Sequence, residues 1–160
     1  MCIRDRLNTV KRWGRWYIGN PISNVIVSGN SFKNINLNKR DPASLFVGAG
    51  YDLQPSDYYP SEYMLVQNVI IENNTIENSG LIAMGTWSSR NIIFDNNRII
   101  NPNLYGNKDR FNGYGRMYAT NCNNIHFNGN TVEITAEAYG EDGIYTESAS
   151  DVYVNGGKYN

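Results

Sequence analysis

The sequence predicts an all-β fold in which short strands stack into a solenoid, and three observations support this prediction. Asparagine occurs 25 times against 7 leucines, and asparagine disfavours helices because its side chain competes for backbone hydrogen bonds. The apolar residues are largely isoleucine, valine and tyrosine, which favour strands. A short motif also recurs along the chain, and such recurrence is typical of repeat architectures.

The motif has the form Asn-h-x-h-x-x-Asn-x-h, where h is an apolar residue. It occurs at 24–32, 68–76, 91–99 and 124–132, with a variant that begins with Asp at 151–159. Successive motifs start 44, 23, 33 and 27 residues apart. These spacings indicate a unit of about 22 residues, with insertions of roughly 10 and roughly 5 residues and one unit that lacks the motif. We place the missing unit at 44–50.

Each unit should contain three short strands. The first strand precedes the motif, and we expect it at 16–19, 45–48, 81–85, 116–120 and 143–147. The second strand is the first half of the motif, and its alternation places one apolar pair per unit inside. These pairs are Val25/Val27, Val69/Ile71, Ile92/Phe94, Ile125/Phe127 and Val152/Val154. The third strand follows the second asparagine, which tolerates the left-handed backbone of a turn and can form an amide ladder between units.

Three strands per unit with an asparagine ladder is the layout of a parallel β-helix. The repeat Asn68-Val-Ile-Ile-Glu-Asn-Asn-Thr-Ile76 resembles the right-handed parallel β-helix repeat of the pectin lyase-like superfamily, over about residues 16 to 160. This resemblance implies a right-handed solenoid of about five rungs, a carbohydrate-active function, and an extracellular or periplasmic location. The superfamily contains glycoside hydrolases, polysaccharide lyases, carbohydrate esterases, viral tailspikes and adhesins, so the fold alone does not choose an activity.

The order of segments adds a weaker resemblance. Residues 43–46, a tyrosine-rich insertion, the motif at 68–76 and residues 81–84 follow one another as in the β-helix region of α-1,3-specific α-galactosidases. This likeness is one of layout and assigns no catalytic residue.

The domain organisation follows from the repeat. Residues 1–12 fit no unit and form a lead that is either a frayed start or a non-native segment. Residues 13–160 form a single β-helix domain with insertions at 51–66, 101–116 and 135–143. Because a solenoid needs a cap at each end and neither is apparent, we expect the chain to be a fragment of a longer helix.

Charge and composition exclude several classes of protein. The formal net charge is −1, and without a basic run the chain has no electrostatic footprint for nucleic acid. No apolar run approaches the length of about 18 residues that membrane insertion requires. One histidine with Cys2 and Cys122 cannot form a structural zinc site. We therefore expect no metal and no cofactor, and we expect Cys122 to be a buried free thiol.

The predicted insertions flank the first strands on both sides, which makes a groove with those strands as its floor. Tyrosine offers a ring face and a hydroxyl, which suits a polysaccharide or oligosaccharide partner, although the same rings could simply pack the insertions onto the scaffold. The candidate substrate-binding residues are Tyr51, Tyr58, Tyr59, Tyr63, Trp87, Tyr105, Arg110, Tyr114, Arg116, Tyr118 and Tyr145. His126 should point away from this groove.

Hydrolysis of a glycosidic bond needs two carboxyl groups, about 5 Å apart for retention or about 6.5–9.5 Å apart for inversion. Asp142 and Glu147 border the predicted floor and rank first, followed by Glu141 and Asp109. We favour an inverting glycoside hydrolase. A polysaccharide lyase, which would use a base such as Lys108, ranks lower because no acidic cluster could hold calcium. The rival from another class is a non-catalytic glycan-binding, adhesin or tailspike segment.

Overall fold

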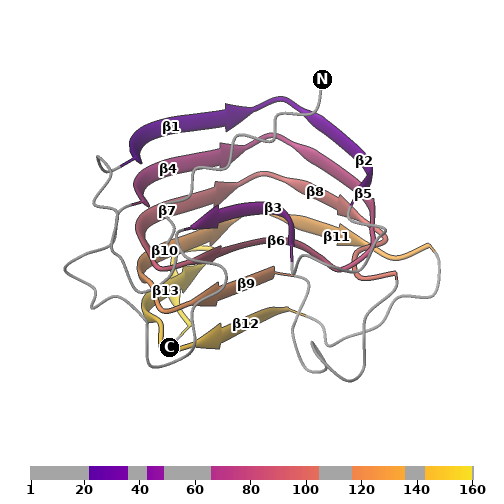
Figure 1. The fold of residues 1–160 in the computed structure, drawn as a ribbon. Helices are drawn as coiled ribbons and strands as arrows, with labels where there is room; N and C mark the ends of the chain where they lie inside the picture. The colour runs from indigo at the N-terminus through magenta and orange to yellow at the C-terminus, as the bar shows by residue number, and fades with distance from the viewer. Residues whose placement is uncertain (1–21, 36–42, 49–65, 105–116, 136–142, 160) are drawn as a thin grey trace, which may run out of the picture.

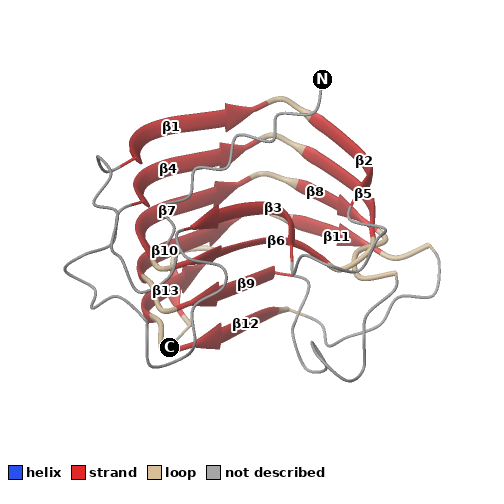
Figure 2. Ribbon diagram, viewed as in Figure 1, coloured by secondary structure: helices blue, strands red, loops and turns tan. Residues whose placement is uncertain are grey.

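The fold is all-β and mostly parallel over the part of the chain that can be described. The structure, a computed structural model, describes residues 22–35, 43–48, 66–104, 117–135 and 143–159. Within these ranges every regular element is a strand, and no helix occurs that could span a membrane (Figure 2). All strand pairs within them are parallel except one. The prediction of an all-β fold with stacked parallel strands is therefore confirmed at this level.

The strands form three sheets that the chain visits in turn (Figure 1). Sheet 1 has the order β1-β4-β7-β10-β13-β14, with bounds Ile22–Ser28, Val66–Glu72, Ser89–Asp95, Asn123–Asn128, Ser150–Val154 and Gly157–Lys158. Sheet 2 contains β2, β5, β8 and β11, with bounds Ser31–Ile35, Thr75–Ser79, Arg98–Ile100 and Thr131–Glu133. Sheet 3 contains β3, β6, β9 and β12, with bounds Ala43–Gly48, Ile82–Trp87, Met117–Thr120 and Ile144–Glu147.

The pairing of β1 corrects the predicted spacing. β1 pairs directly with β4, with Val25 opposite Val69, and β3 pairs with β6, with Leu45 opposite Met84. The spacing of 44 residues therefore covers one step of the stack, and the prediction of a missing unit at 44–50 is wrong. A long insertion and a missing unit lengthen the chain by similar amounts, and only the strand pairing tells them apart.

The last strand also differs from the prediction. β14 does not join sheet 2 but pairs antiparallel with β13, with Val154 opposite Gly157. The two residues between them, Asn155 and Gly156, have φ values of 49° and 79°. Positive φ at both central residues is the pattern of the two-residue hairpin turn that Asn-Gly favours. This local preference explains why the fifth motif turns back on itself.

The apolar pairs of the motif form the core, as the alternation predicts. All ten residues lie in the main hydrophobic cluster or pack against it: Val25, Val27, Val69, Ile71, Ile92, Phe94, Ile125, Phe127, Val152 and Val154. Because the strands pair in register, like residues stack on one another. The rings of Phe94 and Phe127 lie 4.8 Å apart with 5° between their planes.

A ladder of amide side chains runs at the turn between sheets 1 and 2. We call it the buried ladder; its members are Asn30, Asn74, Asn97 and Asn130. The Nδ2 atom of Asn97 donates to the Ile71 carbonyl and to Oδ1 of Asn130, both at 2.9 Å. Its Oδ1 accepts from the backbone N and from Nδ2 of Asn74, both at 3.1 Å. The predicted ladder is confirmed, and it satisfies amides that burial would otherwise leave costly.

The bend beside the buried ladder is made by the residue before each ladder asparagine. These residues are Gly29, Asn73, Asn96 and Gly129, with φ values of 68°, 53°, 51° and 58°. The ladder asparagines themselves do not have positive φ, so the prediction that they adopt the left-handed conformation is wrong. Since the preceding residue makes the bend, the ladder residue can turn its amide inward.

The first asparagine of the motif forms a second ladder, on the surface of sheet 1. We call Asn68, Asn91 and Asn124 the exposed ladder. Their φ values are 54°, 54° and 56°. The Nδ2 atom of Asn91 donates to Oδ1 of Asn68 at 2.9 Å, and that of Asn124 donates to Oδ1 of Asn91 at 3.0 Å. Asparagine is among the few residues other than glycine that adopt this conformation at low cost.

Candidate functional site

Sheet 3 is the stack of first strands that the sequence predicts as the floor of a groove. Four predicted site residues lie on it: Trp87 on β6, Tyr118 on β9, and Tyr145 and Glu147 on β12. The others fall outside the described residues; they are Asp109, Glu141, Asp142, Tyr51, Tyr58, Tyr59, Tyr63, Tyr105, Arg110, Tyr114 and Arg116. The structure thus places part of the candidate site and leaves the walls of the groove undescribed.

The two sides of sheet 3 carry different clusters. Val47, Met84 and Met117 belong to the main core. A second cluster contains Ile82 and Tyr118 as buried residues, with Phe46, Trp87 and Tyr145 packed against them. Phe46, Tyr118 and Tyr145 of this cluster each follow a residue that belongs to the main core or packs against it. Because successive residues of a strand point to opposite faces, these three rings lie on the outer face of the sheet.

The aromatic residues of the outer face follow a register column. Phe46 pairs with Gly85, Gly85 with Tyr118, and Tyr118 with Tyr145. A β-carbon on Gly85 would collide with the ring of Tyr118, so this ring lies over the glycine. The rings of Phe46 and Tyr118 are stacked, with centroids 6.4 Å apart and 25° between planes. Sequence reasoning missed Phe46 and Gly85, although the apolar neighbours Leu45 and Val47 point inward and could have placed Phe46 outside.

Exposure separates the aromatic rings into two groups. Tyr118 is 4% exposed, whereas Phe46, Trp87 and Tyr145 are half-buried. Tyr118 therefore forms the base of the cluster, and the half-buried rings are the ones that solvent reaches. An aromatic ring that is packed on one side and open on the other presents a rigid apolar surface.

Glu147 shares a register column with Trp87. Thr120 pairs with Trp87 on one side and with Glu147 on the other. At about 4.8 Å per strand, Glu147 lies about 10 Å from Trp87 along the stack. Within the strands of sheet 3, Glu147 is the one residue with a charged side chain. The column thus brings one carboxyl-bearing position onto the sheet that carries the aromatic cluster.

Cys122, at the corner between sheets 3 and 1, is a free buried thiol, as predicted. Its Sγ atom donates to the Thr120 carbonyl at 3.1 Å. Burial raises the pKa of the Cys122 thiol far above its usual value, against a smaller opposing effect of the Thr120 backbone. Because the thiolate is the reactive form, Cys122 is not suited to be a nucleophile.

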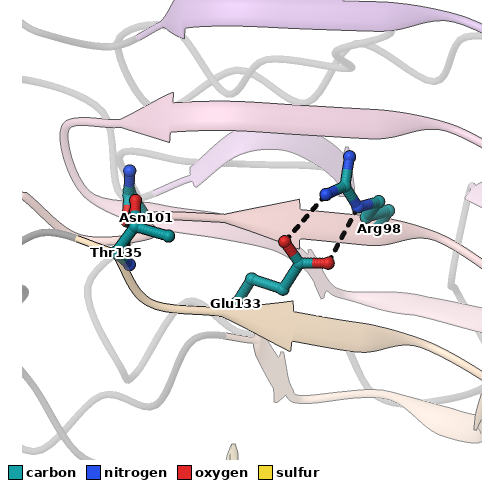
Figure 3. Close-up of polar contacts among 4 residues, drawn as sticks. All are labelled: Arg98, Asn101, Glu133 and Thr135. Carbon is teal, nitrogen blue, oxygen red and sulfur yellow. Dashed lines mark hydrogen bonds and ion pairs between the residues drawn. The ribbon is translucent and has the colours of Figure 1, made fainter.

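Charged residues on sheet 2 hold one another across neighbouring strands (Figure 3). Arg98 donates from Nε and Nη2 to the two oxygens of Glu133, at 2.9 Å and 2.7 Å. Beside them, Oδ1 of Asn101 accepts from the backbone N and from the hydroxyl of Thr135. The hydrogen bond from Arg98 lowers the pKa of Glu133, and Glu133 raises that of Arg98. The Arg98 guanidinium therefore holds Glu133 as a carboxylate, and Glu133 is not poised as an acid.

Among the described residues, no group of three His, Cys, Asp or Glu side chains gathers where it could hold a metal ion. His126 lies on the outer face of sheet 1, as predicted, where its ring stacks on Tyr153.

A comparison of the chain with protein-family models, with curated proteins and with solved structures finds no match. The function must therefore be argued from the residues themselves.

Proposed function

We propose that this chain is part of a right-handed parallel β-helix of the pectin lyase-like superfamily and that it binds a polysaccharide or oligosaccharide on the outer face of sheet 3. The three sheets visited in turn and the buried ladder support the β-helix. The right hand is supported by the strong general preference for right-handed connections between parallel strands of one sheet. An extracellular or periplasmic location is part of this proposal.

The observation that carries the binding proposal is the aromatic cluster on sheet 3. Trp87 and Tyr145 are half-buried, and Tyr118 supports them from below. Sugars have apolar C–H faces and hydroxyl groups, which match the ring faces of tryptophan and tyrosine and the hydroxyl of tyrosine. The indole nitrogen of Trp87 is buried, so Trp87 would contribute its ring face. Trp87 and Tyr145 are thus the proposed sugar contacts, and Tyr118 positions them.

Affinity electrophoresis of the chain in gels that contain single polysaccharides, both neutral and uronate-rich, tests the proposal. Trp87→Ala and Tyr145→Ala should each weaken retardation by about tenfold, which corresponds to about 1.4 kcal/mol of binding free energy lost with each ring. Tyr153→Ala, a half-buried tyrosine on sheet 1, is the matched control. Equal loss in all three variants would show that the effect is general unfolding, and no retardation by any glycan would refute binding.

Hydrolysis of the bound glycan is a second candidate function, and the position of Glu147 in the Trp87 column favours it. An inverting reaction would need a second carboxyl group, for which Asp142 is the sequence-based candidate. Glu147→Gln should then reduce turnover at least about 100-fold while binding persists. Glu133→Gln on sheet 2 is the control. An unmodified chain that binds glycan without turnover would be a non-catalytic binding module. Turnover that Glu147→Gln leaves unchanged would mean that other residues carry out the reaction, as in a lyase.

A further inference from the structure

Two Asn-Gly dipeptides occupy the same place in consecutive units of the motif. Asn128-Gly129 lies at the end of β10, and Asn155-Gly156 forms the turn between β13 and β14. An asparagine followed by glycine is prone to spontaneous deamidation, because no β-carbon shields the glycine nitrogen that attacks the side-chain amide. The two dipeptides therefore have the same local chemistry, and their different surroundings decide which one reacts.

One hydrogen bond joins the two dipeptides and affects them in opposite ways. The main-chain N–H of Gly129 donates to Oδ1 of Asn155 at 2.8 Å. The Gly129 nitrogen would be the nucleophile in a deamidation of Asn128, so this bond engages the group that would have to attack. In a deamidation of Asn155, Oδ1 is the atom on which negative charge develops, and a main-chain N–H that donates to such an oxygen stabilises the charge.

The nucleophile at the second dipeptide is not engaged. Among the described residues, the N–H of Gly156 donates no hydrogen bond. Asn155 and Gly156 are exposed, whereas Asn128 is half-buried. Ring closure also requires rotation of the main chain. This rotation costs less beside β14, which two residue pairs hold to a single neighbour, than in β10, which pairs with β7 and with β13.

We propose that Asn155 is a site of spontaneous deamidation and that Asn128 is protected from it. The Gly156 nitrogen loses its proton to base and bonds to Cγ of Asn155. The bond from Cγ to Nδ2 then breaks, which releases ammonia and leaves a succinimide ring. Water opens this ring at either carbonyl. Opening at the side-chain carbonyl gives aspartate, and opening at the main-chain carbonyl gives isoaspartate, whose main chain is longer by the side-chain methylene.

Isoaspartate at position 155 should open the β13–β14 hairpin. The two-residue turn sets the register in which Val154 lies opposite Gly157, and a longer turn no longer fits that register. Beyond β14, the N–H of Tyr159 donates to the Val152 carbonyl at 2.7 Å, and its hydroxyl donates to the Ile144 carbonyl at 3.0 Å. In the isoaspartate form, separated by ion exchange, the amide of Tyr159 should therefore exchange hydrogen faster. Unchanged exchange would refute this consequence.

Peptide mapping by mass spectrometry, after incubation of the chain at neutral to mildly basic pH, tests the proposal. In the folded chain, Asn155 should convert at least about tenfold faster than Asn128, the effect expected of one hydrogen bond. In urea the two should convert at similar rates, because the hydrogen bond and the sheet are lost. An Asn155 that stays intact in the folded chain, or a ratio of rates that urea leaves unchanged, would overturn the proposal. This inference does not depend on the proposed glycan site.

Substitution of Asn155 tests the hydrogen bond itself. Asn155→Gly keeps the left-handed turn but removes the acceptor, so Asn128 should convert about tenfold faster than in the unmodified chain. Asn155→Asp keeps an oxygen that accepts from Gly129 and is the matched control, in which Asn128 should stay protected. Circular dichroism confirms that both variants keep their strands. Equal conversion of Asn128 in the two variants would refute protection by this bond.

Discussion

The buried ladder and the exposed ladder both join neighbouring levels of the stack by amide-to-amide hydrogen bonds, but they require asparagine for different reasons. Asn97 is 1% exposed, and its amide makes hydrogen bonds to a main-chain carbonyl and to both neighbouring amides. Asn91 is exposed and has a φ of 54°. The fold thus needs the side chain of Asn97 but the backbone conformation of Asn91, and substitutions can separate the two needs.

The largest effect should come from the buried ladder. Asn97→Ala leaves the Ile71 carbonyl and the backbone N–H of Asn74 without the partners that they have now. An unsatisfied buried polar group costs about 1–3 kcal/mol, so the free energy of unfolding should fall by about 3 kcal/mol. Urea denaturation measures this loss. A loss as small as that of Asn91→Gly would mean that water replaces the amide and that the ladder contributes little.

Two glycines show the same contrast between side-chain space and backbone conformation: Gly85 on sheet 3 and Gly129 at the turn between sheets 1 and 2. Gly85→Ala should cost about 2 kcal/mol, because the β-carbon displaces the ring of Tyr118 from a packed cluster. Gly129 is glycine for its φ of 58°, a conformation that Asn73 and Asn96 adopt at the equivalent turn. Gly129→Asn should therefore cost less than Gly85→Ala, since its new atoms meet only the movable side-chain end of Asn96. Thermal unfolding of both variants, followed by circular dichroism, checks the order.

The alanine and glycine variants should follow opposite orders of stability at Asn91 and at Asn97. Asn91→Ala should cost about 1–2 kcal/mol, the usual penalty for a left-handed residue with a β-carbon, whereas Asn91→Gly removes the amide without that penalty. Asn97 does not have positive φ, so Asn97→Gly should cost about 0.5–1 kcal/mol more than Asn97→Ala. Four urea titrations decide the point. The same rank at both positions would contradict the distinction between side-chain and backbone roles.

The two ladders also show what a sequence can and cannot predict. The inward pair Ile92 and Phe94 was predictable because strand alternation is a local pattern. The buried ladder was predictable because its asparagines recur at a fixed place in the motif. The pairing of β1 with β4 was not, since a spacing of 44 residues does not say which strands share hydrogen bonds.

The candidate site divides in the same way. Trp87 and Tyr145 could be placed on sheet 3 because each lies in or beside a recognisable first strand. The aromatic column through Phe46 and Gly85 depends on the register between strands that lie far apart in the chain. Register is set by packing and by turn geometry, neither of which a motif of nine residues records. From the sequence, Gly85 indicates only an interruption of a strand. In the structure, its lack of a β-carbon makes room for the ring of Tyr118.

The smallest effect should come from the ion pair on the surface of sheet 2, where a polar contact is strong in geometry but open to water. Arg98 holds both carboxylate oxygens of Glu133, yet both side chains are about half exposed, and exposed pairs contribute little. The hydrogen bond from Arg98 lowers the pKa of Glu133 in the folded chain. The ion pair therefore contributes to the free energy of unfolding at pH values above the pKa of Glu133 in the unfolded chain. This contribution is lost as pH falls through the lower pKa of Glu133 in the folded chain.

Carboxyl chemical shifts, followed by NMR from neutral to acidic pH, should show the pKa of Glu133 below the usual glutamate range. In Arg98→Gln this pKa should return toward that range, because the bidentate donor is gone. The difference in stability between the unmodified chain and Glu133→Gln should be small at neutral pH and should shrink further in acid. A Glu133 pKa that Arg98→Gln leaves unchanged would mean that the pair does not persist in solution. The ion pair would then contribute nothing to the pairing of β8 with β11, in contrast to the amide hydrogen bonds of the buried ladder.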